Sequence, residues 1–387
     1  MTSKEQLLKE FTIQCDHFMW ADEIILYGNS VIAAIMKIAI KDLGWQNISC
    51  RVFDRGHFIE SDSDTYIREK NIVVLLCSMR AKTRQSMRKD AAHYFPSAFL
   101  YDFFAIYYVW IIRCVQRCVN EHIFCETLLL CRNEDCIPNI DSINTLYCNL
   151  KCKECSNGIP YRKDKKRIPV ASQIRHLNRI TDKIAIAQCN FQGGEVFTDV
   201  KFSNFLYAHS QNSRLAILTI ATNATILPPD SVFQTIRQTG AMIRISDYGI
   251  LSVQKNNLIQ KCAEFNIPNF IFPMAEKWRK FGFYKKRGRS PEELRAVQRN
   301  CCFGTHDLMF LDDRLFCCLR TLYGSVFDID NPDVRANTLE LDSDFSNEEL
   351  RALVNGEQLW RMCDYCDAPM ELIEPAEQMG SYVKEDG

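Results

Sequence analysis

Three cysteines in one short stretch constrain this chain more than any other feature. Cys148, Cys152 and Cys155 are separated by three and then by two residues. In a chain that opens without a secretion signal, such a triplet is typical of a metal or iron–sulfur site rather than of disulfides. Three thiolates can hold three irons of a cubane and leave the fourth iron open, and an open metal position is where chemistry takes place. The sequence therefore predicts a metal loop with one vacant position.

Length and composition predict a protein of several domains in a reducing compartment. The chain has 387 residues, a formal net charge of -1 and 19 cysteines. Its balanced charge gives no indication of a nucleic-acid or membrane-surface partner. No apolar run reaches the roughly 18–20 residues that a spanning helix needs, and the polar opening MTSKEQLLKEF is not a signal peptide. We therefore expect a cytoplasmic protein whose cysteines are metal ligands or small buried hydrophobic residues.

Residues 1–140 are expected to form a Rossmann-like α/β domain. Apolar strands are predicted over 23–27, 48–53 and 71–78, with a helix over 31–43. The phosphate-binding turn is incomplete, because Ser30 and Ala33 stand where the dinucleotide-binding pattern has glycines. A scaffold that binds no nucleotide is therefore the favoured interpretation of this domain. The aromatic run 95–110 is interpreted as a core helix that packs this domain onto the next one.

Residues 141–289 alternate strands with helices, which implies a parallel sheet or barrel. The predicted strands cover 142–147, 183–191, 215–222, 241–245 and 267–272. The first strand runs directly into the cysteine triplet. Glycine and polar residues follow the next three strands: Gly193, Gly194, Glu195, Asn223, Ser246 and Asp247. These are the carboxyl ends of the strands, where barrel enzymes of this order place their sites.

The triplet, so placed, resembles the C-x3-C-x2-C motif of the radical S-adenosylmethionine (radical SAM) family. The resemblance covers about residues 141–275 and implies a partial (β/α)6 barrel. It further implies that the three cysteines bind a 4Fe-4S cluster whose open iron is chelated by S-adenosylmethionine. Cleavage of that cofactor would give methionine and a 5′-deoxyadenosyl radical, which takes a hydrogen atom from the substrate. One residue departs from the pattern: Glu154 precedes the third cysteine, where the family usually has an aromatic residue.

The resemblance also implies roles for the residues at the strand ends. Gly193 and Gly194 would let backbone carbonyls approach the methionyl ammonium closely, and Glu195 would pair with that ammonium. Asn223 would donate to the ribose or the carboxylate, and Ser246 would contact the same groups. The alternative for each is an ordinary turn or strand-end residue.

A second cysteine set resembles the auxiliary-cluster extension called SPASM or, in its shorter form, twitch. The expected ligands of one auxiliary 4Fe-4S cluster are Cys302, Cys318, Cys363 and Cys366. The doublets Cys301/Cys302 and Cys317/Cys318 leave the register open. A four-cysteine zinc site is the structural alternative, because cysteine spacing does not separate zinc from iron.

The last part of the chain is expected to be a small cysteine-rich auxiliary domain over 290–375, with a hairpin at 307–318 and a disordered tail over 376–387. The basic stretch 277–289 is interpreted as a solvated linker or loop, with a patch that binds an anionic substrate as the alternative. The remaining cysteines are interpreted as core residues, apart from Cys131 and Cys136, whose role stays open.

The resemblance implies an oxidoreductase that acts on a small molecule. An auxiliary cluster suits the oxidation of a carbohydrate or nucleotide-linked alcohol, with the cluster as electron acceptor and flavodoxin or ferredoxin as reducing partner. The general base is not identified by the sequence, and Asp247, Tyr248 and Glu276 are candidates. One alternative is a maturase of a ribosomally synthesised peptide. Another, of a different class, is a non-catalytic iron–sulfur or zinc scaffold.

Overall fold

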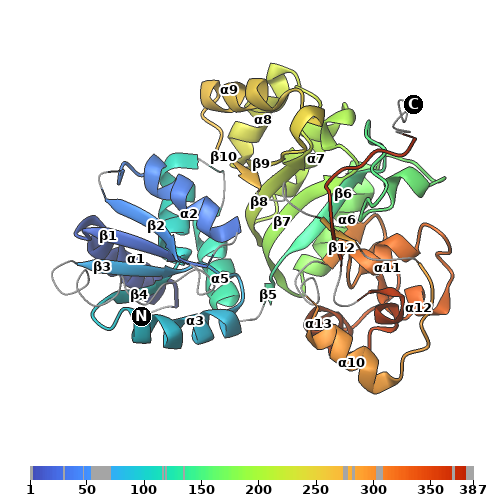
Figure 1. The fold of residues 1–387 in the computed structure, drawn as a ribbon. Coiled ribbons are helices and arrows are strands. Elements are labelled where there is room, and N and C mark those ends of the chain that lie inside the picture. Colours follow the sequence, from blue (N-terminus) through green and yellow to red (C-terminus); the bar gives the residue numbers. More distant parts are fainter. Residues whose placement is uncertain are drawn as a thin grey trace, which may run out of the picture.

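The computed structural model describes residues 3–28, 31–46, 48–53, 71–115, 117, 120–133, 136–272, 278–280, 284–301, 308–367 and 371–380. Figure 1 shows an N-terminal α/β unit on the left, a large sheet with its helices in the centre, and a C-terminal group of short helices at the lower right. Among the described residues, no helix is long and apolar enough to cross a membrane.

The N-terminal unit is built on a four-stranded parallel sheet in the order β2-β1-β3-β4. Its elements are α1 (Ser3–Met19), β1 (Glu23–Tyr27), α2 (Val31–Asp42), β2 (Ser49–Phe53), β3 (Ile72–Leu76), α3 (Ala81–Tyr94), β4 (Phe99–Asp102), α4 (Phe104–Trp110), the π-helix Ile111–Val115 and α5 (Glu121–Arg132). β1 and β3 are buried throughout, as the central strands of a parallel sheet should be. The turn at 29–30, which carries Ser30, lies outside the described residues.

The single helix predicted over 95–110 is wrong in its first half. Residues 99–102 form β4, which pairs in parallel with β3, and only 104–110 are helical. Aromatic residues are favoured in strands as well as in buried helices, so composition alone does not separate the two. The helical half does pack onto the next unit as expected: the Tyr107 hydroxyl donates to the Ala216 carbonyl at 2.9 Å.

The central sheet carries the predicted order of strands and helices. Its elements are β5 (Cys136–Ile137), β6 (Ile140–Thr145), α6 (Val170–Thr181), β7 (Ala185–Gly193), α7 (Phe202–Ser210), β8 (Leu215–Thr222), α8 (Asp230–Thr239), β9 (Met242–Ser246), α9 (Lys255–Glu264) and β10 (Asn269–Phe272), with short 3-10 turns at Ile159–Tyr161, Val196–Thr198 and Gly249–Leu251. Neighbouring strands from β6 to β10 are all parallel. One face of the sheet packs against α6 to α9 in a shared hydrophobic core.

The sheet differs from a simple six-stranded partial barrel in its outermost strands. β12 (Leu308–Leu311) pairs in parallel with β6, on the opposite edge from β10. β12 is apolar and buried along its whole length, so it can complete the open edge of the sheet beside β6. The C-terminal elements therefore extend the central sheet instead of forming a separate layer.

The C-terminal elements continue from that edge. They are β11 (Trp278–Lys280), α10 (Pro291–Arg299), β12, β13 (Arg314–Phe316), α11 (Leu319–Gly324), α12 (Pro332–Arg335), β14 (Thr338–Glu340), α13 (Asn347–Asn355), the 3-10 helix Arg361–Tyr365 and β15 (Glu371–Ile373). β12 and β13 form the predicted hairpin, and Asp312 at its turn has a φ of 56°. Leu308, Phe310 and Trp360 share one hydrophobic core with the helices of the central sheet.

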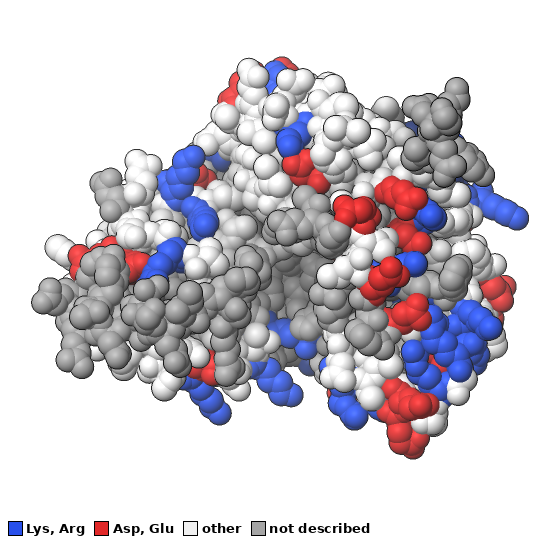
Figure 2. All heavy atoms as spheres, in the orientation of Figure 1, with Lys and Arg blue, Asp and Glu red and all other residues white. Residues whose placement is uncertain are grey.

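Charged side chains of both signs are interspersed on the face drawn in Figure 2, and no field of a single sign covers it. This mixture agrees with the formal net charge of -1.

Candidate functional site

The cysteine triplet lies in one tight loop that follows β6. The Cys155 amide donates to the Cys152 carbonyl at 3.2 Å, and the Gly158 amide donates to the Cys155 carbonyl at 2.9 Å. Burial raises the pKa of all three thiols, that of Cys148 to about 11, and in each case the charge of another triplet cysteine adds to the rise. The structure thus brings Cys148, Cys152 and Cys155 near one another.

N–H groups point at the sulfurs of this loop. The Cys148 sulfur accepts a hydrogen bond from a backbone amide at 3.4 Å, and the Cys152 sulfur accepts one from Gln378 Nε2 at 3.3 Å. Backbone amides of residues 157–159 donate to Cys155 and oppose the effect of burial on its pKa. N–H donors stabilise thiolates and adjust the potential of the clusters they bind. The donor set therefore fits a thiolate-ligated iron–sulfur cluster.

A 4Fe-4S cubane requires a different arrangement of its cysteine sulfurs from the arrangement around a single metal ion. Among the described residues, no three His, Cys, Asp or Glu side chains are gathered closely enough to hold one metal ion. In a cubane each thiolate binds a different iron, so the ligand sulfurs stand farther apart than around one metal.

Gly193 and Gly194 are required by a close backbone contact with the chain that enters the triplet. A Cβ on Gly193, whose φ is 141°, would lie 2.5 Å from the Thr145 carbonyl oxygen. A Cβ on Gly194 would lie 1.8 Å from the Tyr147 carbonyl oxygen. The Gly194 amide donates to the Thr145 carbonyl at 2.9 Å, and the Gly193 carbonyl accepts from Asn157 Nδ2 at 2.8 Å. The glycine pair thus fastens the end of β7 to the triplet loop.

Glu195 is a fully buried carboxylate that faces only neutral donors. It is 1% exposed, and it accepts hydrogen bonds from the Thr222 hydroxyl at 2.8 Å, the Asn223 amide at 2.8 Å and the Phe197 amide at 3.2 Å. Burial raises its pKa to about 7, and it forms no ion pair with any described residue. A cation beside such a carboxylate would favour its charged form. This environment fits the ammonium group that the sequence assigned to Glu195.

The residues predicted after β8 and β9 lie beside the same loop to different degrees. Asn223 Nδ2 is 3.8 Å from the Cys148 sulfur, so its side chain borders the triplet. Ser246 ends β9 and stays partly exposed. Asp247 forms an ion pair with Lys255 at 2.6 Å, so its charge is already compensated. Asn223 and Ser246 stay candidates for cofactor contacts, and Asp247 is a weaker one.

Aromatic side chains from other parts of the chain lie near Glu154. Its charge contributes to the raised pKa values of Tyr161 and Tyr323, after burial as the main cause. Tyr161 and Tyr323 are therefore aromatic residues that the structure brings near Glu154.

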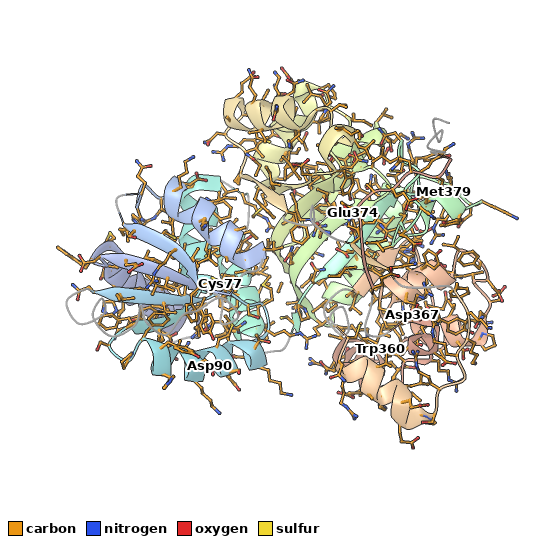
Figure 3. The ribbon with its side chains drawn as sticks, in the orientation of Figure 1. Cys77, Asp90, Trp360, Asp367, Glu374 and Met379 are labelled. Atoms are coloured by element: carbon orange, nitrogen blue, oxygen red, sulfur yellow. The ribbon has the colours of Figure 1, made fainter. Side chains whose placement is uncertain are left out.

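The C-terminal segment covers the triplet loop, so the prediction of a disordered tail over 376–387 is wrong for 376–380. The Lys153 amide donates to the Glu377 carbonyl at 2.7 Å, and the Met379 amide donates to the Lys151 carbonyl at 2.8 Å. In Figure 3 the segment runs from Glu374 near the centre to Met379 at the upper right, and Figure 1 draws it in red. Backbone pairing holds the segment, which is why its polar composition does not reveal it. Residues 381–387 lie outside the described residues.

We expect Gln378 to influence the cluster bound by the triplet. Because its Nε2 donates to the Cys152 sulfur, Gln378→Ala should lower the reduction potential by about 40 mV, the equivalent of about 1 kcal/mol. An EPR-monitored redox titration measures the shift. Truncation after residue 375 should do the same and speed iron loss to a chelator, whereas truncation after residue 380 is the matched control. Equal potentials in all four proteins would contradict the role of this segment.

The second cysteine set is also gathered in space. Burial raises the pKa of Cys363, and the charges of Cys318, Cys366 and Cys301 raise it further. Burial likewise raises the pKa of Cys366 to about 12, with Cys318 as the next cause. A hydrogen bond with Cys317 lowers the pKa of Cys318. The described cysteines whose charges affect one another's pKa values here are therefore Cys301, Cys318, Cys363 and Cys366. Cys317 is hydrogen-bonded to Cys318.

The structure bears on which cysteine of the doublet Cys301/Cys302 is the ligand. Cys302, the preferred ligand from sequence, lies outside the described residues. Cys301 is described, and its charge reaches both Cys363 and Cys366. Among the described residues, Cys301 is therefore the cysteine of the first doublet that the structure brings to this group.

Residues 284–289 form a loop in which Lys285, Lys286 and Gly288 are exposed, as expected of a linker, but Arg289 is only partly exposed and contacts the second cysteine set. Arg289 Nη1 donates to the carbonyl oxygens of both cysteines of the C-x2-C segment, at 2.7 and 2.9 Å. The amides of Gly288 and Arg289 donate to the carboxylate of Asp364, at 3.0 and 2.9 Å. Asp364 is buried and needs these donors. The basic residues thus cradle the second cysteine set, where their charge would favour an anionic cluster.

Sequence reasoning missed two kinds of residue at these sites. Gln378 gave no signal, because nothing in the local pattern links it to a loop more than two hundred residues away. Arg289 carried a signal in the basic composition of its stretch, which is equally typical of a solvated surface.

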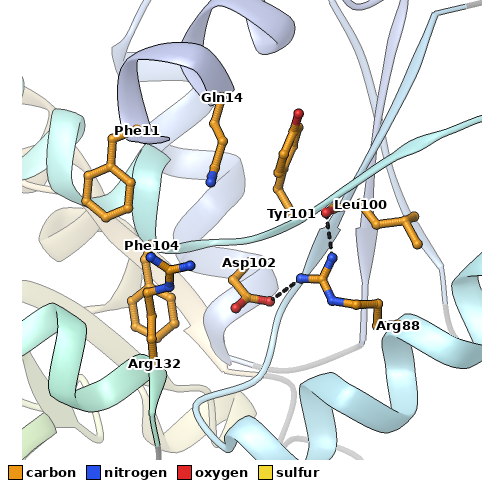
Figure 4. Close-up of a pocket in the computed structure, with 8 residues that line it drawn as sticks. All are labelled: Phe11, Gln14, Arg88, Leu100, Tyr101, Asp102, Phe104 and Arg132. Atoms are coloured by element: carbon orange, nitrogen blue, oxygen red, sulfur yellow. Dashed lines mark hydrogen bonds and ion pairs between the residues drawn. The ribbon is translucent and has the colours of Figure 1, made fainter. Parts of the chain in front are cut away.

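A cavity of about 220 Å³ lies apart from both cysteine groups, in the N-terminal unit. Its lining includes two arginines, which Figure 4 shows together with Asp102 and Tyr101. Arg88 pairs with Asp102 at 3.0 Å, and Arg132 pairs with Glu10 at 2.9 Å. Both guanidinium groups are therefore already engaged with carboxylates of the protein.

Comparisons with known proteins give limited additional information. No family model and no curated protein matches the chain. The chain is similar in structure, at low identity, to solved proteins with bound S-adenosylmethionine (AdoMet). BtrN in complex with AdoMet and 2-DOIA shares 13% identity over 59% of this chain and 92% of that one, with a TM-score of 0.39. SuiB from Streptococcus suis, bound to S-adenosylmethionine, shares 13% over 64% and 74%, with a TM-score of 0.32.

The protein anSMEcpe with bound AdoMet and Cp18Cys peptide shares 14% identity over 35% of this chain, with a TM-score of 0.28. This chain spans 42% of the length of that one. All these TM-scores are low, so we argue the function from the residues of this chain.

Proposed function

We propose that this chain is a radical SAM enzyme. The observation that carries the proposal is the triplet loop: three thiols, one buried and two half-buried, that accept N–H hydrogen bonds and are fastened by a glycine pair to a buried carboxylate without an ion pair among the described residues. In this proposal Cys148, Cys152 and Cys155 hold a 4Fe-4S cluster, and Glu195 receives the ammonium of S-adenosylmethionine. When bound and reduced, the cluster supplies cleavage of the cofactor to methionine and a 5′-deoxyadenosyl radical, which abstracts hydrogen from a substrate.

The chain's own residues prepare the site for this cofactor in two ways. Glu195, Thr222 and the Asn223 amide form a hydrogen-bonded unit that fixes a carboxylate beside the triplet. Asn223 also borders the Cys148 sulfur, so one residue connects the cluster loop with that carboxylate. A mobile carboxylate would have to be ordered before it could receive an ammonium, and here that cost is already met.

The second part of the proposal concerns the C-terminal cysteines. We infer that Cys301, Cys318, Cys363 and Cys366 hold an auxiliary 4Fe-4S cluster. When bound, such a cluster supplies an acceptor for one electron, which suits the oxidation of an alcohol to a carbonyl compound after loss of a hydrogen atom and a proton. Arg289 and the nearby Arg320 support this part, because the charge of Arg320 lowers the pKa of Cys366 against the effect of burial.

The test of the proposal is anaerobic reconstitution with iron and sulfide, followed by dithionite and S-adenosylmethionine. We expect about eight irons per chain, as two cubanes require, and formation of 5′-deoxyadenosine detected by chromatography. If no 5′-deoxyadenosine forms although the irons are bound, the chain is a non-catalytic iron–sulfur protein. About four irons together with one zinc would make the second site structural.

A further inference from the structure

The inner face of the central sheet differs from the face that packs against the helices. Helix-facing residues such as Phe191, Ile220 and Ile245 are 0% exposed. On the opposite face, four residues from neighbouring strands are partly exposed: Gln192, Arg244, Ser246 and Phe272. Because side chains alternate between faces, these residues all point to the inner side. The carboxyl ends of the strands, which lead to the triplet loop and Glu195, are called the cofactor edge. The part of the inner face nearest this edge is therefore accessible.

The far end of the inner face is closed by the N-terminal unit. Ile217, Met242 and Phe270 belong to the same hydrophobic core as Tyr107 and Trp110 of α4. Arg117 reinforces the contact, since its guanidinium donates to the carbonyl oxygens of residues 215 and 216, at 2.7 and 2.5 Å. A molecule on the inner face thus has the cofactor edge on one side and an apolar floor on the other.

A polar chain crosses the inner face just above that floor. Asn190 Nδ2 donates to Asp141 Oδ1 at 2.7 Å, and Thr219 donates to Asn190 Oδ1 at 2.9 Å. Gln188 Nε2 donates in turn to the Thr219 hydroxyl at 3.3 Å. Asp141 Oδ1 accepts both hydrogen bonds that reach this carboxylate, one from Asn190 and one from Asn139. The second oxygen, Oδ2, accepts none of the hydrogen bonds that the structure shows among the described residues.

Arg244 brings an uncompensated positive charge to the same face. Its Nε is buried without a hydrogen-bond partner, and its guanidinium carbon lies 4.8 Å from the centre of the Phe272 ring. Its charge lowers the pKa of Asp141, against the larger effect of burial. The two groups nevertheless form no ion pair, and Arg244 pairs with no other carboxylate among the described residues. A buried Nε without a partner is costly, and an anionic ligand on this partly exposed side chain would satisfy it.

We propose that Arg244 and Asp141 bind the substrate, a small polyhydroxylated anion whose carboxylate or phosphate group lies at Arg244 and whose hydroxyl lies at Asp141 Oδ2. At about 3.3 Å per residue, Arg244 is about 7 Å from the end of β9 and Asp141 about 13 Å from the end of β6. That interval fits one small molecule between the cofactor edge and the floor. The statement that this ligand is the substrate rests on the proposed radical SAM function, whereas the ligand site itself does not.

The test is isothermal titration calorimetry on the reconstituted full chain with S-adenosylmethionine. The probes are gluconate, glucose 6-phosphate, inorganic phosphate and glucose. We expect the wild-type chain to bind a hydroxylated anion, gluconate if the site takes carboxylates and glucose 6-phosphate if it takes phosphates, more tightly than glucose. Arg244→Gln should weaken that binding by about tenfold or more, and Arg244→Lys should weaken it less. Asp141→Asn should weaken the hydroxylated anion but leave inorganic phosphate unaffected.

Arg335→Gln, at an exposed position on α12, is the matched control and should bind like the wild type. Circular dichroism and iron content verify that each variant is folded. If the wild type binds none of the anionic probes at millimolar concentration, or if Arg244→Gln binds them unchanged, the proposal is overturned. Binding with the expected variant pattern but without 5′-deoxyadenosine formation would support the site while refuting the proposed radical SAM function.

Discussion

Replacing Cys152 by alanine is expected to remove about four irons per chain and to abolish 5′-deoxyadenosine formation. The same result is expected for Cys148→Ala and Cys155→Ala, because a cubane that keeps an open iron for its cofactor has only three protein ligands to lose. Iron and sulfide analysis after anaerobic reconstitution measures the first effect, and chromatography of the reaction mixture measures the second.

The matched control for the triplet is Cys50→Ala. Cys50 is a half-buried cysteine of β2 in the N-terminal unit, so its removal tests whether iron binds cysteines without selectivity. We expect the control to keep its iron and its activity. A triplet variant that still forms 5′-deoxyadenosine at the wild-type rate would remove the basis of the proposed function. Equal iron loss in the control would show that the iron counts do not report on the triplet.

Local pattern was sufficient for much of the fold. β8 occupies 215–222 as predicted, because a mainly apolar run that is buried throughout is typical of a central strand in a parallel sheet. The sequence Ser290-Pro-Glu-Glu293 is typical of a helix start, and the structure shows the full capping box of Ser290 with Glu293. Such features depend on neighbours within a few residues, so one sequence contains all that they need.

The errors arose where a segment depends on a distant partner. β4 exists because it pairs with β3, and β12 joins the sheet because the edge of β6 is open. Residues 376–380 are ordered by backbone hydrogen bonds to 151–153. Backbone pairing leaves no mark on side-chain composition, so a polar strap and a disordered tail have the same sequence character.

The sequence allowed the cysteines and glycines of the candidate site to be named, but not their surroundings. The triplet and the glycine pair follow from spacing and strand order. The glycines, however, turned out to be fixed by a backbone contact with Thr145 and Tyr147, which is a packing constraint that no motif describes. Arg244 and Asp141 were missed because single charged residues within strands carry no spacing signal. Only the register of the sheet places them on one face.

The second large effect is expected at the C-terminal cysteines. Cys318→Ala and Cys363→Ala should each lose about four irons while the triplet keeps its own, which would halve the iron content. Cys317 offers a matched control of unusual closeness. It is the neighbour of Cys318 and is 0% exposed, and its thiol is hydrogen-bonded to Cys318 and Thr321. Because the pKa of the Cys318 thiol is lowered and that of Cys317 is raised, Cys318 is the thiolate of the pair, and Cys317→Ala should retain the second cluster.

Comparison of the first doublet completes this experiment. Because the charge of Cys301 reaches Cys363 and Cys366, Cys301→Ala should lose the second cluster and Cys302→Ala should keep it. The reverse result would restore the ligand set that was expected from the sequence. Metal analysis of the same variants separates iron from zinc: if the C-terminal variants lose zinc and no iron, the second site is structural. Electron uptake from a substrate radical would then have no acceptor at that position, and an oxidation of alcohols would have to be abandoned in favour of a redox-neutral or peptide-modifying reaction.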